Sequence, residues 1–251
     1  MSTQPTLVFL HGFAESREIW SELLSGFPAD YRLVNLNLLG HGTNIHDVRD
    51  YSMEAQARYV AEKLQAAGVE KALLVGHSMG GYVALAFAER WPERVAGLAL
   101  INSSAYADSE DKKASREKNV AFVERHGVEK FMESFIRPLF APANRESMGR
   151  QREFLEEIGK ATPAETIIGG LRAMAARPDR TKVLGTAKFP VLLVAGKEDL
   201  AVPLEHSVAQ APLAPVAHAL FLAEVGHLAY FEEPSAVRRA LVDFAAAVHG
   251  Q

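Results

Sequence analysis

The chain of 251 residues contains no cysteine. This absence excludes disulfide bonds, thiolate metal ligands and cysteine nucleophiles together, so any chemistry must use oxygen or imidazole groups. An excess of positive charge is also lacking, because 27 Lys and Arg residues stand against 31 Asp and Glu residues, for a formal net charge of −4. We therefore expect neither nucleic acid nor an anionic membrane as a partner.

Long hydrophobic runs are lacking as well. The apolar run Leu7 to Leu10 is too short to be a signal sequence or to span a membrane, and Met1 to Pro5 carries no basic residue. We expect a cytoplasmic protein. The composition, 48% hydrophobic and 23% charged, is typical of a soluble globular chain, and the length suits one α/β domain with or without an insertion.

Six short apolar runs predict strands that are buried on both faces, because they are continuous rather than alternating. They cover residues 6–10, 32–36, 72–75, 95–101, 190–195 and 217–222. Helical patterns lie between them; one covers residues 52–67, with Ser52 as the N-cap and Gly68 as the stop. This alternation predicts a doubly wound, mostly parallel α/β sheet with right-handed crossovers.

The alternation breaks between Tyr106 and about Lys188, where the patterns are helical only. They cover residues 109–126, 128–140, 144–160 and 163–176. The run Thr162 to Glu165 has the spacing of a capping box, with proline at the first helical position. We interpret the charges of the first segment as a solvated helix face; they include Lys112, Lys113, Arg116 and Lys118.

These patterns divide the chain into two parts. Residues 1–105 and 186–251 are predicted to form the α/β core, and residues 106–185 an inserted helical cap. The insertion follows the fourth predicted strand. We therefore expect the base of the cap to lie over the carboxyl edge of the sheet, where sites of open α/β sheets occur.

The most informative motif is Gly76-His77-Ser78-Met79-Gly80, which directly follows the third apolar run and precedes an alanine-rich helical stretch. A strand, a sharp turn and a helix in this order form an elbow that exposes the serine hydroxyl at the edge of the sheet. Small residues two before and two after the serine let the strand and the helix pass each other, and glycine occupies both places.

A serine needs a general base, and the base needs an orienting partner. His227 follows the sixth apolar run and Asp199 follows the fifth, so both are predicted at the same edge of the sheet as Ser78. The order Ser, Asp, His is the one expected for this arrangement. Two alternatives stay open: His11, which follows the first strand, as the base, and Glu198 as the orienting acid.

Attack on a carbonyl group would generate an oxyanion that needs two backbone donors. The amide of Met79, at the start of the helix after the elbow, is one candidate. The amide of Phe13, in the glycine turn after the first strand, is the other. The alternative is that His11-Gly12 only turns the chain. His77 is expected to pack beside the elbow, because its ring cannot turn onto the neighbouring hydroxyl.

Together these motifs resemble the α/β-hydrolase superfamily over nearly the whole chain. The resemblance comprises His11-Gly12-Phe13, Gly40-His41-Gly42, the elbow at Ser78, the turn from Gly196 to Asp199, and Gly226-His227. It implies an eight-stranded, mostly parallel sheet with a lid, here with the first two strands missing. Asn37-Leu38-Leu39 departs from the family pattern, in which aspartate and proline often precede the glycine.

The resemblance implies a carboxylesterase-like serine hydrolase that forms an acyl-enzyme on Ser78, with a small carboxylic ester as substrate. A lactonase or lyase acting on a charged metabolite is an alternative, and the carboxylate would then be held by Arg137, Arg145, Arg152 or Arg172. A ligand-binding protein without activity is a third possibility. Metal-ligand spacings and phosphate-binding loops are absent from the sequence, so we expect no metal and no cofactor.

The apolar residues of the cap are candidates for the wall of an acyl or aromatic pocket. The alternative is that most of them only pack the cap onto the core. The candidates are Phe131, Met132, Phe135, Ile136, Leu139 and Phe140, with Tyr106, Leu200 and Leu228 near the active edge.

Overall fold

The computed structural model describes residues 4–250, so Met1 to Thr3, on which the expectation about a leader partly rests, lie outside the described residues. Its sheet has six strands in the order β2-β1-β3-β4-β5-β6, and every pairing is parallel. The strands are β1 (Thr6–Leu10), β2 (Arg32–Leu36), β3 (Ala72–His77), β4 (Val95–Ile101), β5 (Val191–Gly196) and β6 (Ala217–Leu222). The predicted parallel sheet is confirmed.

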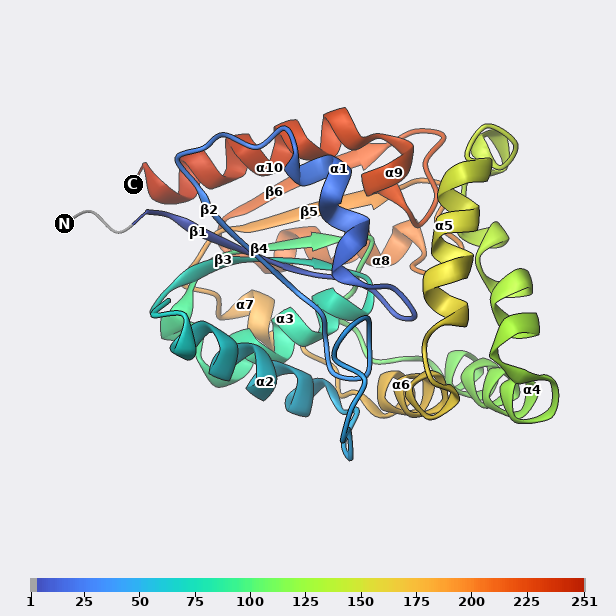
Figure 1. Ribbon diagram of the computed structural model, residues 1–251. Helices are drawn as coiled ribbons and strands as arrows, with labels where there is room; N and C mark the ends of the chain where they lie inside the picture. The colour runs from blue at the N-terminus through green and yellow to red at the C-terminus, as the bar shows by residue number, and fades with distance from the viewer. Residues whose placement is uncertain (1–3, 251) are drawn as a thin grey trace.

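Helices cover both faces of the sheet (Figure 1). On one face lie α1 (Ser21–Leu24) and α10 (Pro234–His249), and on the other lie α2 (Met53–Ala66), α3 (Met79–Arg90) and α7 (Thr181–Gly185). Burial follows from this arrangement, because β1, β3 and β5 are buried throughout whereas the edge strands β2 and β6 are partly exposed. The doubly wound architecture explains why the central strands are continuous apolar runs.

The remaining elements are short or belong to the segment between β4 and β5. The short helices are α8 (Leu204–Gln210), α9 (Ala229–Glu232) and the 3₁₀ turns η1 (Arg17–Trp20), η2 (Pro92–Arg94), η3 (Arg137–Leu139), η4 (Pro142–Asn144) and η5 (Ala211–Leu213). The long ones are α4 (Glu110–Phe135), α5 (Gly149–Lys160) and α6 (Ala164–Ala176).

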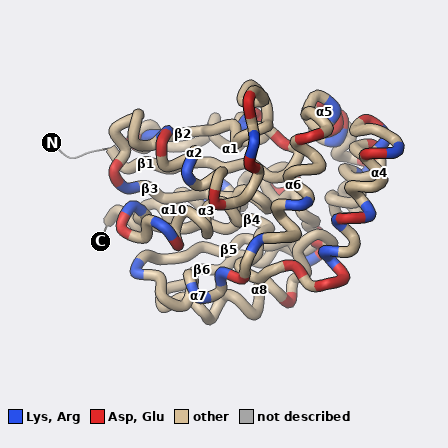
Figure 2. Tube along the Cα trace, turned by 90° about the horizontal axis from the view of Figure 1, so that it is seen from below, with Lys and Arg blue, Asp and Glu red and all other residues tan. Residues whose placement is uncertain are grey.

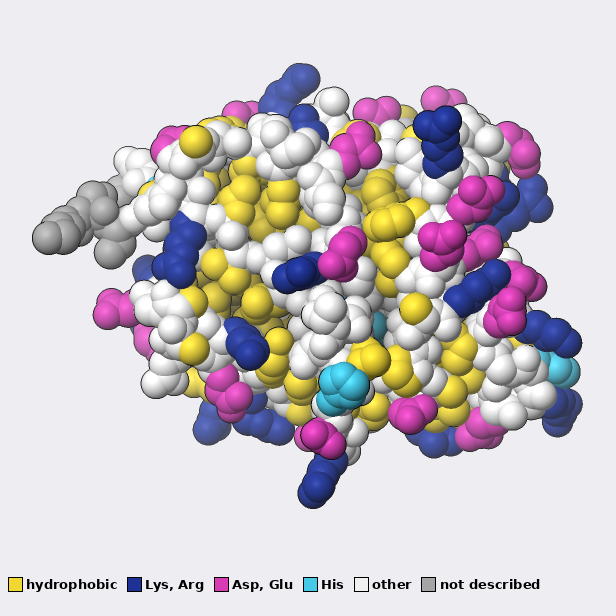
Figure 3. All heavy atoms as spheres, in the orientation of Figure 1, with side chains coloured by type: hydrophobic (Ala, Val, Ile, Leu, Met, Phe, Trp, Pro, Cys, Tyr) yellow, Lys and Arg dark blue, Asp and Glu magenta, His cyan; other side chains and the backbone are white. Residues whose placement is uncertain are grey.

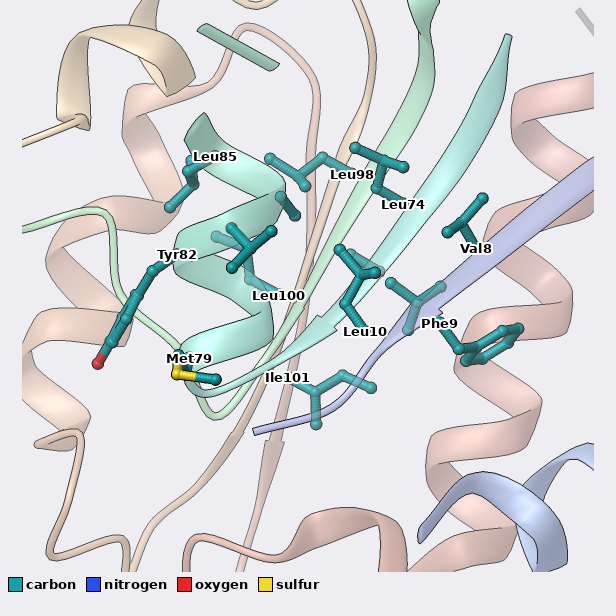
Figure 4. Close-up of a cluster of buried hydrophobic side chains, with 14 of the residues drawn as sticks. Val8, Phe9, Leu10, Leu74, Met79, Tyr82, Leu85, Leu98, Leu100 and Ile101 are labelled. Atoms are coloured by element: carbon teal, nitrogen blue, oxygen red, sulfur yellow. The ribbon is translucent and has the colours of Figure 1, made fainter. Parts of the chain in front are cut away.

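The core of the protein lies where α3 packs on the middle of the sheet. Figure 4 shows leucine side chains of three neighbouring strands beside this helix, with Tyr82 pointing away from them: Leu10, Leu74, Leu98 and Leu100. All four leucines are at most 1% exposed. Burying a side chain of this size stabilises the fold by about 1.5 to 3 kcal/mol, so this cluster holds the elbow helix firmly on the sheet.

Both sequence signals for the boundaries of α2 are confirmed. The hydroxyl of Ser52 accepts a hydrogen bond from the amide of Ala55 at 3.1 Å, and this satisfies one of the free donors of the first turn. Gly68 follows the helix with a φ of +67°, a conformation that glycine adopts without strain.

Helices α4, α5 and α6 gather at the end of the molecule toward which the strands point (Figure 1). The predicted break between two helices at residue 127 is a kink within α4, where Gly127 has φ 82° and ψ 166°. The predicted capping box was wrong. The hydroxyl of Thr162 donates to the carbonyl of Ile158 at 3.1 Å, and Pro163 itself is the N-cap of α6.

Charged side chains of both signs are interspersed over the molecule. Figure 2 shows them alternating along the chain, and Figure 3 shows the same mixture on the surface around α4 and α5. Within residues 4–250, none of the helices combines the length and the apolar character that a bilayer crossing requires.

The crossing of β1 and α3 leaves no room for a side chain at Gly80. A Cβ atom there would lie 2.2 Å from the carbonyl oxygen of Leu10. We expect Gly80→Ala to lower the free energy of unfolding by about 1 to 3 kcal/mol in urea denaturation, because backbone must move to admit the methyl group. Gly149→Ala is the matched control, since nothing lies within 4 Å of its added Cβ. Equal stability of the two variants would contradict the conclusion that β1 and α3 leave no space for a side chain at Gly80.

Candidate active site

Ser78 lies in the turn between β3 and α3 in a strained conformation. Its φ of 48° and ψ of −114° fall in a region that residues other than glycine rarely occupy. A Cβ atom at Gly76 would lie 2.5 Å from backbone atoms of Gly80, so the tight turn requires glycine there. The turn directs Ser78 into a cavity of about 80 Å³ at the carboxyl end of the sheet.

His227 and Asp199 are in direct contact. The Nδ1 atom of the imidazole lies 2.8 Å from Oδ2 of Asp199. The Oδ1 atom of Asp199 accepts hydrogen bonds from the amides of Ala201 and Val202 at 2.8 and 2.9 Å. A third partner is Asn102, whose Nδ2 donates to Oδ2 at 2.9 Å. The carboxylate is thus held in one orientation and directs the imidazole.

Electrostatics keep this carboxylate ionised. Burial alone would raise the pKa of Asp199, but its electrostatic interaction and hydrogen bond with the His227 ring, together with the amide of Val202 and the side chain of Asn102, lower it below its usual range. An ionised Asp199 accepts from Nδ1–H of His227. The other ring nitrogen, Nε2, is then the one that can accept a proton.

Ser78 and His227 line the same cavity, and Phe13 lies in its wall as well. Among the hydrogen bonds of residues 4–250, none joins the Ser78 hydroxyl to the His227 ring. Met79 is the first residue of α3, so its amide has no acceptor within the helix. Of the five candidate residues from the sequence, three line the cavity, whereas Asp199 contacts it through His227 and Met79 follows Ser78 in the chain.

The two alternative residues have different surroundings. The amide of Leu38 donates to Nε2 of His11 at 3.0 Å, and Nδ1 lies 2.8 Å from the carbonyl of Gly12, so both ring nitrogens are engaged. Burial lowers the pKa of His11, which keeps the ring neutral. Glu198 is exposed, in contrast to its buried neighbour Asp199. Neither alternative lines the cavity of Ser78.

A buried network beneath the elbow was not predicted. Oε2 of Glu15 lies 3.1 Å from Nδ1 of His77 and accepts from the amide of Gly12 at 2.6 Å, while the Tyr230 hydroxyl donates to Oε1 at 2.8 Å. On its other side His77 presents Nε2 to the carbonyl of His227 at 3.0 Å. The network joins the turn that carries Phe13 to the loop that carries the imidazole.

The pair at the centre of this network is charged. Burial alone would lower the pKa of His77, but the carboxylate of Glu15 and the carbonyl of His227 raise it. Burial alone would raise the pKa of Glu15, but the charge and hydrogen bond of His77 and the hydroxyl of Tyr230 lower it to about 2. Both ring nitrogens of His77 face acceptors, which is consistent with a protonated ring.

A second buried carboxylate, that of Glu232, ties the loop of His227 to the segment after α4. Its Oε1 accepts from the amide of Gly226 at 2.9 Å, and its Oε2 from the amide of Ala141 at 2.9 Å. The carbonyl of Leu139 in turn accepts from the amide of His227 at 2.7 Å. The sequence did not reveal this role of Glu232, because Ala141 is 91 residues away and Gly226, six residues away, belongs to a loop without a regular spacing.

The predicted pocket wall is only partly right. Of the nine apolar candidates, Phe135 and Leu139 line the cavity, and Leu200 lines an adjoining pocket of about 390 Å³.

The interpretation of the first α4 charges as a solvated face was wrong for Lys112 and Arg116, which line the cavity. The basic residues proposed for a carboxylate are absent from its wall: Arg137, Arg145, Arg152 and Arg172.

Among residues 4–250, no three or more His, Asp or Glu side chains converge in an arrangement that could hold a metal ion. The histidines of the site are already paired with carboxylates or backbone carbonyls.

Comparison with known proteins identifies the family. The profile of the alpha/beta hydrolase fold matches residues 5–234, and the chain belongs to this family. A thermophilic esterase from Thermogutta terrifontis, solved with malate bound, superposes with a TM-score of 0.92 at 29% identity, over 98% of this chain and 91% of that one.

Two relatives of similar length have different activities. A pimeloyl-acyl-carrier-protein methyl ester esterase from Xanthomonas oryzae pv. oryzae is 31% identical over 97% of this chain and 96% of its own length. A 2-succinyl-6-hydroxy-2,4-cyclohexadiene-1-carboxylate synthase from Klebsiella pneumoniae is 30% identical over 93% of this chain and 90% of its own. Two further relatives are longer proteins, and the chain covers 62% and 60% of their lengths.

Proposed function

We propose that this protein is a serine hydrolase that cleaves a small carboxylic ester through an acyl-enzyme. The observation that carries this proposal is the contact of His227 with Asp199 at the wall of the cavity that also contains the strained Ser78. Relatives with esterase activity, one of them 31% identical over nearly the whole chain, support the same class of reaction.

The proposed reaction uses groups of this chain in turn. The hydroxyl oxygen of Ser78 attacks the ester carbonyl carbon while Nε2 of His227 takes the hydroxyl proton. The amides of Phe13 and Met79 stabilise the oxyanion that forms. His227 then returns the proton to the leaving alcohol. In the second half of the reaction a water molecule attacks the acyl carbon while His227 takes its proton, and His227 returns this proton to the Ser78 oxygen as the bond to the acid breaks. Asp199 holds the imidazole throughout and stabilises its charged form.

We also propose that residues 106–185 act as a cap that restricts access to this site. In support, α4 and η3 contribute Phe135 and Leu139 to the wall of the cavity. The cavity of about 80 Å³ leaves little space around Ser78, which favours a small group on the reacting side of the ester.

A serine-directed fluorophosphonate tests the nucleophile directly. We expect one adduct per chain, located at Ser78 by peptide mass spectrometry, because the proposed base and oxyanion donors would activate this hydroxyl. Ser147→Ala, which removes an exposed hydroxyl, should label like the wild type, and Ser78→Ala should not label. An adduct at another serine, or none on the folded protein, would exclude the proposed nucleophile.

A lactonase or lyase use of the same residues is the second candidate. It is favoured by the relative that is a synthase rather than an esterase, at nearly the same identity. A panel of neutral esters and charged lactones distinguishes the two. Fast conversion of one charged lactone alongside slow turnover of every ester would favour the second candidate.

A further inference from the structure

The first turns of α4 present a polar face to the cavity of Ser78. Lys112, Ser115, Arg116 and Asn119 all line it. Their spacing of three, four and seven residues places them on one side of a helix. The part of the cavity wall that comes from this helix segment is therefore polar and carries two cations.

The two cations differ in their partners. Arg116 forms an ion pair with Asp108, and Arg177 also binds this carboxylate, at 2.7 Å. Lys112 has only the carbonyl oxygen of Ala201, 3.3 Å from its Nζ. Of the residues that the structure describes, no carboxylate lies within 4.0 Å of the Lys112 ammonium.

Within the part of the chain that the structure describes, Lys112 therefore has no carboxylate in direct contact at the wall of the cavity, and Asp108 and Asp199 act on its charge only from a greater distance. Its pKa is lowered, first by burial and then by the neighbouring charge of Arg116, and the more distant carboxylates of Asp108 and Asp199 offset this shift only in part. An anionic group in the cavity could supply the direct ionic partner that the ammonium lacks and form a charge-assisted hydrogen bond. Ser115 and Asn119 offer further polar contacts one turn along the helix.

Lys112 also lies between the cavity of Ser78 and the adjoining larger pocket, and lines both. The pocket of about 390 Å³ beside the cavity shares five wall residues with it: Tyr82, Lys112, Ser115, Ala201 and Val202. A ligand with its reacting carbonyl at Ser78 can therefore extend past Lys112 into the larger pocket. Such a ligand passes the ammonium of Lys112, and the pocket beyond it is lined by charges of both signs, from Asp108, Asp111 and Arg177.

We propose that Lys112 binds a free carboxylate of the substrate, so that the natural substrate is an ester or lactone that also carries a carboxylate group. The inference rests on the proposed function, because it places the reacting carbonyl at Ser78. One unpaired ammonium matches one carboxylate, whereas a phosphate dianion would call for more than one free cation.

Paired chromogenic esters test the subsite. The mono-p-nitrophenyl ester of glutaric acid carries a free carboxylate, and p-nitrophenyl pentanoate is its neutral counterpart of equal chain length. We expect Lys112→Met to lower kcat/KM for the charged ester by about 10- to 100-fold, mainly through KM, because one charge-assisted hydrogen bond is lost. Turnover of the neutral ester should stay within about twofold of the wild type, and Lys112→Arg should restore part of the loss.

Lys113 supplies the matched control. Its ammonium is partly exposed, pairs with Glu110 at 2.8 Å and does not line the cavity. Lys113→Met should therefore leave the kinetics of both esters unchanged. Equal losses on the charged and neutral esters, or no loss on either, would overturn the subsite, and so would an equal effect of the two lysine substitutions.

A binding measurement separates this inference from the proposed hydrolysis. Glutarate binding to Ser78→Ala, measured by calorimetry, does not depend on turnover. We expect Lys112→Met in that background to weaken the affinity by about 10-fold or more. If Lys112→Met leaves the affinity for glutarate unchanged, the carboxylate subsite is excluded, whereas the proposed hydrolase activity is not affected by this result. Preference for propyl phosphate over glutarate would overturn the assignment to carboxylate.

Discussion

Ser78→Ala should lower kcat for p-nitrophenyl acetate hydrolysis by about 10⁴- to 10⁶-fold, because the acyl-enzyme cannot form without the hydroxyl. The backbone donors near Phe13 and Met79 would remain, so a small residual rate over water is expected. Release of nitrophenolate measures the effect, and the wild type should show a burst equal to one acyl group per active site. A variant that retains a tenth or more of the wild-type kcat would exclude Ser78 as the nucleophile.

The role of Asp199 is tested by its substitution, with the neighbouring carboxylate of Glu198 as the matched control. Asp199→Asn should lower kcat by about 10⁴-fold, since the imidazole would lose the acceptor that fixes its tautomer. Glu198→Gln changes an exposed carboxylate next to it and should stay within about twofold of the wild type. Similar losses for both variants would indicate that the acid has been assigned to the wrong residue.

Glu15→Gln should lower the free energy of unfolding by about 3 to 5 kcal/mol at pH 6, the cost of removing one partner of a buried ion pair. The carboxylate is 3% exposed and accepts from His77, Tyr230 and the amide of Gly12, so the amide side chain cannot replace all three interactions. Urea denaturation measures the loss.

The free energy of unfolding should depend on pH in a way that is specific to the ion pair of Glu15 and His77. The pKa of Glu15 is lowered from 4.5 to about 2, so its contribution is complete above pH 4.5 and is lost as the pH falls toward 2. The pKa of His77 is raised above 6.5, so its contribution is complete below pH 6.5 and is lost as the pH rises through the folded value. The difference between wild type and Glu15→Gln should therefore be greatest between pH 4.5 and 6.5.

Glu18→Gln is the control for this measurement. Glu18 lies on the same turn but pairs with Arg17 at the surface, where both side chains are exposed. Its loss should cost about 1 kcal/mol or less. A pH profile of Glu15→Gln that parallels the wild type would mean that the buried pair is not charged.

The sequence predicted the sheet well because its signals are local. Four of the six observed strands have the predicted bounds. The prediction that all six are buried on both faces was wrong for the edge strands β2 and β6, which carry polar residues such as Asn35 and His218 and are partly exposed.

The elbow was equally visible, because Gly76, Ser78 and Gly80 are close in sequence and meet steric demands of one turn. The positions of Asp199 and His227 followed from strand ends, since parallel strands bring their carboxyl ends to one edge.

The buried network was not predictable in this way. Glu15 and His77 are 62 residues apart, and Tyr230 is 215 residues from Glu15, so no spacing connects them. The place of Lys112 depends on how α4 docks against the core, which is set by tertiary packing rather than by the helix's own pattern. Thr162 formed a bond to the preceding helix instead of a cap, because both geometries suit a threonine at a helix end.

Glu232 accepts hydrogen bonds from two amides in different parts of the chain. Gly226 immediately precedes His227, and Ala141 lies in the segment that follows α4. A shift of that segment would strain the same carboxylate that steadies the backbone of His227. If residues 106–185 act as the proposed cap, we expect a ligand that displaces α4 to change the position of the His227 ring through Glu232, without contacting that ring itself.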